Sequence, residues 1–347
     1  MTRSVRILAI LLTATTPAAA AAMQVVPMTD LSYFEKPHPV IFPDADIKLC
    51  LIEFEAPSGN PTGHLLTLEL HQAYGRRIGD LPGAAVVAWV AGSGLSISNF
   101  RLKADQVGAD QKAQLAVWGR VLSDAQQPPQ AAPRLSLLVP PPGISAKFVS
   151  SSARGVLDAP VAQGWVDFAP SGDMESLAAF LSGIAHYYKG ATHSGAEARQ
   201  WLTQSVAEFG DYLRRVPDTA DSGAAAQAHL FSARALVRLG DLAGAARHAS
   251  DAARLNPYDP AVPQAQAVIS LLQDQPQAEV RAHVAEAVRL APADPSARLD
   301  LALLDAAAGK GGEALKRINE AKQVQQLLHG EASPAQEKLE RDIRQMR

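Results

Sequence analysis

The sequence predicts an α+β protein, in which an N-terminal antiparallel β-sandwich is followed by a C-terminal solenoid of α-helical hairpins. The chain has 347 residues, which suits about two domains. Apolar residues alternate with a period of two between residues 44 and 170, whereas the period is close to 3.6 from residue 174 onward. With 47% hydrophobic and 19% charged residues, the chain can bury a sizeable core.

Residues 1–22 predict a secretory signal peptide. Arg3 and Arg6 stand before a short aliphatic block, and an alanine run follows that block. The block is much shorter than the roughly 20 apolar residues that span a bilayer, so no transmembrane anchor is expected. We therefore expect cleavage near Ala20 or Ala22 and a periplasmic or secreted mature protein.

The β-sandwich is expected over residues 44–170, after an extended, proline-rich lead-in over residues 23–43. Short alternating runs are separated by clusters of Gly, Pro, Asn and Asp, which is typical of half-buried strands. In one such run Leu66, Leu68 and Leu70 alternate with polar residues, so this face is expected to be buried. The predicted strands are 47–55, 64–73, 84–91, 95–103, 113–122, 134–139, 146–149 and 164–168.

Cysteine content and charge narrow the possible functions. Cys50 is the one cysteine of the chain, so no internal disulfide can form, and its apolar surroundings predict a buried thiol. The formal net charge of -3 leaves no surplus of cations to neutralise phosphates. Nucleic acid is therefore not expected as a partner.

Small residues recur at a near-constant interval in the second half. Ala252, Ala287 and Ala321 are spaced by 35 and 34 residues, and Pro257 and Pro292 repeat the interval of 35. Such an interval is the mark of a repeat architecture. Small side chains are needed where two helices cross closely, because bulky ones hold the backbones apart.

This pattern resembles the tetratricopeptide repeat family, in which each repeat is a pair of antiparallel helices. The sequence departs from the family where His229 and Arg298 take the place of a large aromatic residue, and where Asp274 replaces the glycine of the middle turn. Ser333-Pro334 before Glu337 predicts a terminal capping helix. The expected copies are 174–217, which is longer and degenerate, 226–259, 260–294 and 295–328, with the capping helix at 334–346.

The resemblance implies that the first helices of the repeats line a concave groove that holds a peptide or partner protein. The partner-binding positions carried over to this chain are Ile184, Tyr188, Gln227, Leu230, Arg234, Arg238, Ser296, Leu299 and Leu303.

Arg234 and Arg238 are four residues apart and project from one helical face, so they could grip an acidic segment through charge-assisted hydrogen bonds. The alternative is a solvated face whose arginine stems cover neighbouring leucines. The three groove leucines could equally be interhelical packing. On the groove interpretation, reversing both charges weakens partner capture and leaves thermal stability nearly unchanged.

The sequence predicts no catalytic, cofactor-binding or metal site. The turn at residues 92–94 has neither the spacing of a nucleophile elbow nor the third glycine of a dinucleotide loop. His64 and His71 are expected on opposite sides of one strand, and His248 and His283 on outer helix surfaces exposed to solvent. None of these pairs makes a metal site without distant ligands.

We therefore expect an exported, non-enzymatic binding or scaffold protein of the cell envelope. One alternative is a carbohydrate- or envelope-polymer-binding protein that uses the β domain, which exposure of Trp89, Trp118 and Trp165 on one sheet face would favour. A second alternative is a hydrolase, which a pocket with a serine or carboxylate beside His64 or His71 would favour.

Overall fold

The computed structural model describes residues 21–28, 39–56, 60–91, 104–122, 128–150, 153–216 and 222–329, together with the single positions 337, 340, 341 and 344. The predicted signal peptide lies outside these residues, apart from its last two positions. No helix in the described ranges is both long and apolar enough to cross a membrane.

The N-terminal half contains one six-stranded sheet, with the strand order β1-β3-β2-β4-β5-β8. β1, β3, β2 and β4 are parallel, whereas β5 and β8 are antiparallel to their neighbours. The strands of this sheet are β1 (Ala22–Met28), β2 (Ile47–Ile52), β3 (Ala84–Ala91), β4 (Leu115–Leu122), β5 (Gln130–Leu137) and β8 (Gly164–Asp167).

The predicted antiparallel β-sandwich is wrong, because the strands form one sheet in which four neighbouring strands are parallel. Parallel strands need crossover connections, and two of the connections in this sheet contain helices, α1 (Thr62–Arg77) and α2 (Ala104–Asp110). The run 64–73 lies inside α1 and is not a strand. Its alternating leucines also fit a helix, because Leu66, Leu70 and Tyr74 are four residues apart and are all buried. The predicted strand 95–103 lies outside the described residues.

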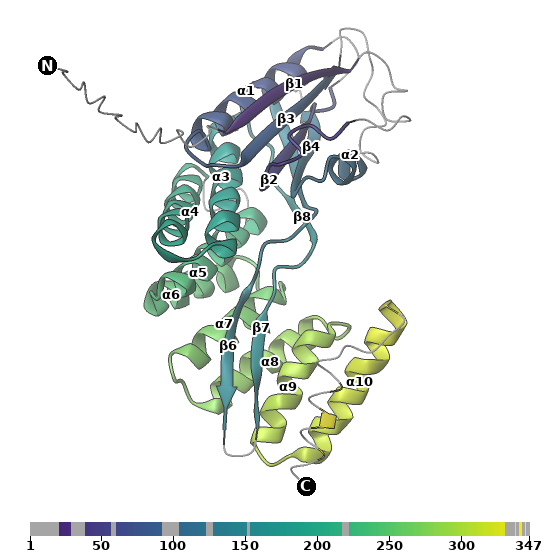
Figure 1. The fold of residues 1–347 in the computed structure, drawn as a ribbon, viewed down its shortest axis with the longest axis vertical. Helices are drawn as coiled ribbons and strands as arrows, with labels where there is room; N and C mark the ends of the chain where they lie inside the picture. The colour runs from purple at the N-terminus through teal and green to yellow at the C-terminus, as the bar shows by residue number, and fades with distance from the viewer. Residues whose placement is uncertain are drawn as a thin grey trace, which may run out of the picture.

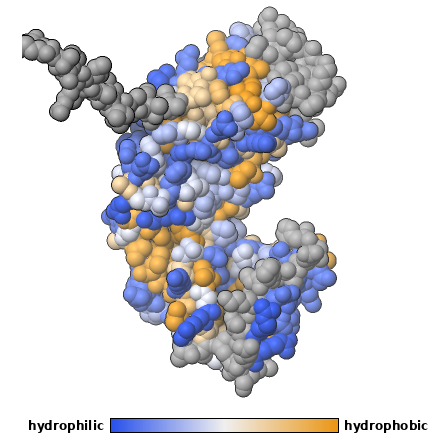
Figure 2. All heavy atoms as spheres, viewed as in Figure 1, coloured by the Kyte–Doolittle hydropathy of each residue, from blue (hydrophilic) through white to orange (hydrophobic). Residues whose placement is uncertain are grey.

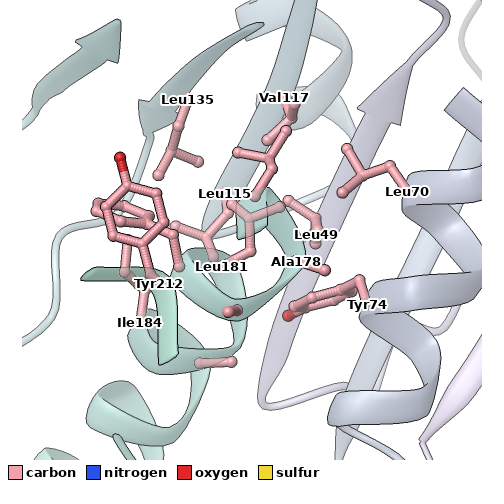
Figure 3. Packing of buried hydrophobic residues seen from close by; sticks show 14 of the residues in the cluster. Leu49, Leu70, Tyr74, Leu115, Val117, Leu135, Ala178, Leu181, Ile184 and Tyr212 are labelled. Atoms are coloured by element: carbon pink, nitrogen blue, oxygen red, sulfur yellow. The ribbon is translucent and has the colours of Figure 1, made fainter. Parts of the chain in front are cut away.

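Helices cover both faces of the sheet. Leu49, Leu115 and Leu135 of the sheet pack with Leu70 of α1 and Leu181 of α3 (Met174–Thr192), as Figure 3 shows. On the other face, a smaller cluster joins strands β2 and β3 to α2. The first helix of the predicted repeat region is therefore also a layer of the α/β core.

The second half is a series of antiparallel helical hairpins, which confirms the tetratricopeptide-like repeats (Figure 1). One helix pair lies over each predicted copy, although α5 begins at Ser222 and not at residue 226. The pairs are α3 with α4 (Gly195–Arg215), α5 (Ser222–Leu239) with α6 (Leu242–Leu255), α7 (Ala261–Leu272) with α8 (Gln277–Leu290), and α9 (Pro295–Ala307) with α10 (Gly311–His329).

The repeated small residues are buried in the helical array. Ala252, Ala287 and Ala321 are fully buried. The turn inside each hairpin needs a positive φ, which Asp274 adopts at 55° and Gly240 at 88°. Aspartate is among the few non-glycine residues that tolerate this conformation, so the departure at residue 274 keeps the turn. Of the predicted capping helix 334–346, only four positions are described, and all four are helical.

Candidate functional site

A β-hairpin of the chain itself lies on the inner face of the helical array. β6 (Ile144–Val149) and β7 (Arg154–Ala159) pair with each other and are separate from the six-stranded sheet. Figure 1 shows the hairpin running from the sheet along the array. β6 contacts α5 and α7, and β7 contacts α7 and α9. We call α5, α7 and α9 the inner helices; they are the first helices of their repeats, which the sequence predicts to line the groove.

The hairpin presents an apolar face to the inner helices. Side chains alternate between buried and exposed along β6, and the cross-strand register puts Ile144 opposite Ala159 and Ala146 opposite Leu157 on one face. These residues share a core with Phe148 and with side chains of all three inner helices. The period-two pattern thus indicates a strand with one buried face, as it does in a sheet, but here helices cover that face.

Gly155 packs closely against α9. A Cβ atom at this position would lie 2.6 Å from a methyl carbon of Leu303, which is too close for a real contact. Gly155 stands opposite Phe148 in the register. The absent side chain therefore leaves space for Leu303, one of the predicted groove residues.

Arginines of α5 bind the base of the hairpin through backbone carbonyl groups. Arg234 donates from Nη2 to the carbonyl oxygen of Pro160 at 3.0 Å, and Arg238 donates from Nη2 to that of Gly143 at 2.5 Å. These two carbonyls lie at the same open end of the hairpin, where Ile144 pairs with Ala159: one comes just after β7 and the other just before β6. Arg234 and Arg238 thus bind one segment together, as predicted, but that segment belongs to the same chain and its acceptors are uncharged carbonyl groups.

Two tyrosines of α3 fix the segment that leads into β6. The Tyr187 hydroxyl donates to the carbonyl of Pro142 at 2.8 Å, and the Tyr188 hydroxyl donates to that of Val139 at 2.9 Å. Because this segment lies between β5 and β6 and belongs to neither strand, these carbonyl groups have no partner in a sheet, and side-chain donors satisfy them instead. Tyr188, a predicted groove residue, therefore also binds the chain's own backbone.

Arg234 is not on a solvated helix face. The residue is 1% exposed, and desolvation lowers the pKa of its guanidinium, an effect that the charge of Asp259 partly offsets. Its guanidinium carbon lies 5.6 Å from the centre of the Phe231 ring. The structure argues against the expectation that charge reversal leaves stability unchanged at this residue, because a carboxylate here would be buried among apolar groups and would face a carbonyl oxygen.

A pair of carboxyl groups meets at the contact between the hairpin and α9. Asp300 is 8% exposed, and its Oδ2 accepts a 3.4 Å hydrogen bond from the backbone N–H of Asp158. Burial raises the pKa of Asp300 well above its ordinary range, and the nearby charges of Asp158 and Asp294 raise it further. Burial also raises the pKa of Asp158. This contact of the hairpin is electrostatically unfavourable when both carboxyl groups are charged.

The remaining predicted groove residues separate into three groups. Leu230 is buried and Leu299 half-buried in the core that includes the hairpin. Ile184 instead packs in the core beneath the sheet. Gln227 donates to Asp259 at 2.6 Å, and the backbone of Ser296 donates to the N-cap carboxylate of Asp294.

The free energy gained by burying the apolar side chains of the hairpin shows whether the inner helices can form an open groove. Ile144, Phe148 and Leu157 are at most 6% exposed. Fully burying three side chains of this size contributes ~5–9 kcal/mol in apolar contact. Ordering the hairpin offsets part of this, but a competing segment would also have to replace the arginine–carbonyl bonds. The hairpin is therefore a fixed part of the core.

The histidines are placed differently from the sequence prediction. His64 and His71 both lie on α1, and Nδ1 of His64 is 3.4 Å from a carboxylate oxygen of Glu53. The cavity of about 230 Å³ that Phe168, Tyr212 and Arg215 help to line does not include this pair. The hydrolase alternative therefore stays a prediction.

His248, predicted to be solvent-exposed, lies 2.9 Å from His229 between their Nδ1 atoms. Burial lowers the pKa of His248, which favours the neutral form that such a hydrogen bond requires. Within the described chain, no group of three or more His, Cys, Asp or Glu residues could hold a metal ion.

The three tryptophans of the sheet differ in exposure. Trp89 is buried and Trp118 half-buried, whereas Trp165 on the edge strand β8 is 66% exposed. The guanidinium of Arg134 lies between two of these rings, 5.1 Å from the centre of Trp118 and 5.4 Å from that of Trp165. One flat indole is thus held in place and open to solvent.

Comparisons with solved structures return tetratricopeptide repeat proteins at low identity. The first repeat domain of Spaghetti (RPAP3), bound to the HSP90 peptide SRMEEVD, is 18% identical with a TM-score of 0.31, and the match covers 35% of this chain and 90% of that one. TTC0263 of Thermus thermophilus is 17% identical with a TM-score of 0.34 over 50% and 89%. MamA of Desulfovibrio magneticus RS-1 is 13% identical with a TM-score of 0.36 over 44% and 77%. No family model and no curated protein matches the sequence.

Proposed function

We propose that this protein is an exported interaction scaffold of the cell envelope, in which β6 and β7 join the α/β sheet and the helical array into one unit. The observation that carries the proposal is the use of Arg234 and Arg238 to hold backbone carbonyls of the hairpin. Because these side chains are committed within the chain, a partner meets the outward face of the hairpin and the rim of the array. The proposal assigns no catalytic step.

Position-specific photocrosslinking tests where partners bind. A photoreactive residue is placed at Lys147, on the outward face of the hairpin, and in a matched variant at Arg247, an exposed residue of α6. Both variants are expressed in the native host. The proposal expects one recurring protein adduct at residue 147 and none at residue 247. Adducts confined to residue 247, or no adduct at either position, contradict it.

Export is tested separately from binding. The signal peptide predicts that the protein recovered from the envelope fraction begins after Ala20 or Ala22, and N-terminal sequencing reads the boundary directly. β1 begins at Ala22, and the backbone N–H of Ala21 donates to Gly79, so cleavage after Ala20 keeps the whole strand. A full-length protein that retains residue 1 and stays in the cytoplasm contradicts export.

The exposed indole of Trp165 supports a second candidate function, binding of a carbohydrate or envelope polymer at the sheet. A flat aromatic surface can stack on a sugar ring, and Arg134 with its ion-pair partner Asp167 offers hydrogen-bonding groups beside it. Of the three tryptophans that this alternative needs, one meets the condition fully. Titration with soluble cell-wall oligosaccharides should then shift tryptophan fluorescence, and Trp165→Ala should abolish the shift; an equal shift in the variant removes this candidate.

A further inference from the structure

The outward face of the hairpin carries two cations beside two exposed valines. The register places Lys147 opposite Val156, and Val149 opposite Arg154. Val149 is 67% exposed and Val156 is 47% exposed. The ion pairs of the described residues involve neither Lys147 nor Arg154. Where the hairpin lies in Figure 1, Figure 2 shows hydrophobic and hydrophilic atoms interspersed on the surface.

The two long edges of the hairpin differ. β7 packs beside α9, with Gly155 against Leu303 and the Asp158 backbone against Asp300. β6 has β7 as a neighbour on one side, and no strand of the described chain pairs with its other side. An unpaired strand edge presents a row of backbone donors and acceptors, to which another extended segment can add.

We propose that β6 accepts an extended acidic segment of a partner protein as a third strand. This rests on the proposed scaffold function and names the partner's chemistry. A strand added along β6 places alternate side chains on the same outward face as Lys147 and Val149. Carboxylates there face Lys147 directly, and the long Arg154 side chain reaches across Val149 toward them. Aliphatic side chains of the added strand cover the exposed valines.

The fixed position of the hairpin favours this mode of binding. Its buried face is held by the inner helices and by Arg234 and Arg238, so the edge is ordered before a partner arrives and less entropy is lost on binding. A second copy of the chain is disfavoured, because two hairpins would oppose Lys147 and Arg154 with the same charges. Two cations are also too few for nucleic-acid binding in a chain whose net charge is -3.

A fluorescein-labelled peptide of alternating glutamate and threonine is the probe, with the same peptide carrying lysine in place of glutamate as its control. Fluorescence anisotropy is measured on the full mature protein at low and physiological ionic strength. The acidic peptide should bind saturably and the basic peptide should not. Lys147→Glu with Arg154→Glu should weaken binding by about tenfold or more, since like charges then face each other.

A matched double variant, Arg199→Glu with Arg247→Glu, makes the same charge change on exposed positions of α4 and α6 and should bind like the wild type. All four substitutions are at exposed positions, so each protein should fold. Hydrogen exchange should slow at β6 amides when the acidic peptide is saturating, which distinguishes strand addition from loose charge attraction.

Equal affinity for both peptides, unchanged affinity in the hairpin variant, or no saturable binding at millimolar peptide each overturn the proposal. In those cases Lys147 only protects a strand edge from unwanted pairing. If photocrosslinks at residue 147 still capture a partner while the probe fails, the scaffold function stands and the acidic strand does not.

Discussion

Shortening Leu157 to alanine tests how strongly the hairpin is built into the helical core. Leu157 is fully buried, and its cross-strand neighbour Ala146 is too small to fill the space that the leucine leaves. A buried Leu→Ala change costs ~2–5 kcal/mol, and a site that cannot collapse belongs in the upper part of that range. The adjacent Val156 faces solvent at 47% exposure, so Val156→Ala should change stability by less than about 0.5 kcal/mol.

The assay is urea unfolding followed by circular dichroism, with hydrogen exchange on the same proteins. Leu157→Ala should lower the free energy of unfolding by ~4–5 kcal/mol and speed exchange both in β6–β7 and at the inner helices. Val156→Ala should do neither. If the two variants lose similar, small amounts of stability, the hairpin is not part of the core. Faster exchange of the hairpin alone, with the helices unaffected, would equally contradict the reasoning.

Three further predictions concern single contacts of the hairpin. Folding raises the pKa of Asp300, so its contribution to stability is present at acid pH and is lost as the pH rises above 3.8 through that raised pKa. Asp300→Asn should therefore be more stable than the wild type at pH 7. In urea titrations, this difference in stability should shrink toward pH 4. A constant difference across this range would exclude the linkage. Arg234→Glu should destabilise by ~3–5 kcal/mol by leaving an uncompensated buried charge, seen as a lower thermal midpoint, and an unchanged midpoint would show that Arg234 is solvated. Gly155→Ala should destabilise by ~1–3 kcal/mol through overpacking, whereas Gly164→Ala, where the added Cβ meets nothing within 4 Å, should be nearly neutral; equal effects would mean that α9 does not approach the hairpin.

The helical repeats could be predicted because their signal is local. Ala252, Ala287 and Ala321 are small for a reason that acts within each hairpin and its neighbour, so the stride survives in the sequence. The turn residue Asp274 departs from glycine but keeps the positive φ. The small residues and the positive φ are required within each repeat, so a single sequence is enough to predict them.

The sheet could not be predicted correctly, because strand order and direction depend on distant segments. Leu66, Leu68 and Leu70 fit a strand by period, and Leu66 and Leu70 also fit a helix. The parallel pairing of β2 with β3 decides between strand and helix, because it requires a crossover connection, and the run lies in that connection. No residue of the run 64–73 encodes that pairing.

The sequence predicts part of the candidate site, namely the residues of the inner helices, but not the hairpin that they hold. The resemblance places Leu230, Arg234 and Leu303 on one inner face, and in the structure each of the three packs with or binds the segment of the hairpin. The alternation over residues 144–149 predicts one buried face, but no local feature shows that this face is covered by helices that begin only at Ser222, Ala261 and Pro295. Burial of Arg234 and the meeting of Asp300 with Asp158 follow from that long-range contact, so sequence reasoning missed both.

A cysteine pair across the hairpin and α9 tests the central claim most directly, which is that the inner helices hold the chain's own hairpin. In Gly155→Cys with Leu303→Cys, the two sulfur atoms should meet, since a Cβ at residue 155 lies 3.3 Å from Cγ of Leu303. The native Cys50 is buried, and burial raises the pKa of its thiol to about 12, so it should not compete. Mild oxidation should give an intramolecular disulfide in the monomeric protein, whereas Val156→Cys with Leu303→Cys should not crosslink. Two thiols that stay free in the folded double variant, or crosslinks found only between molecules, would contradict the docked hairpin.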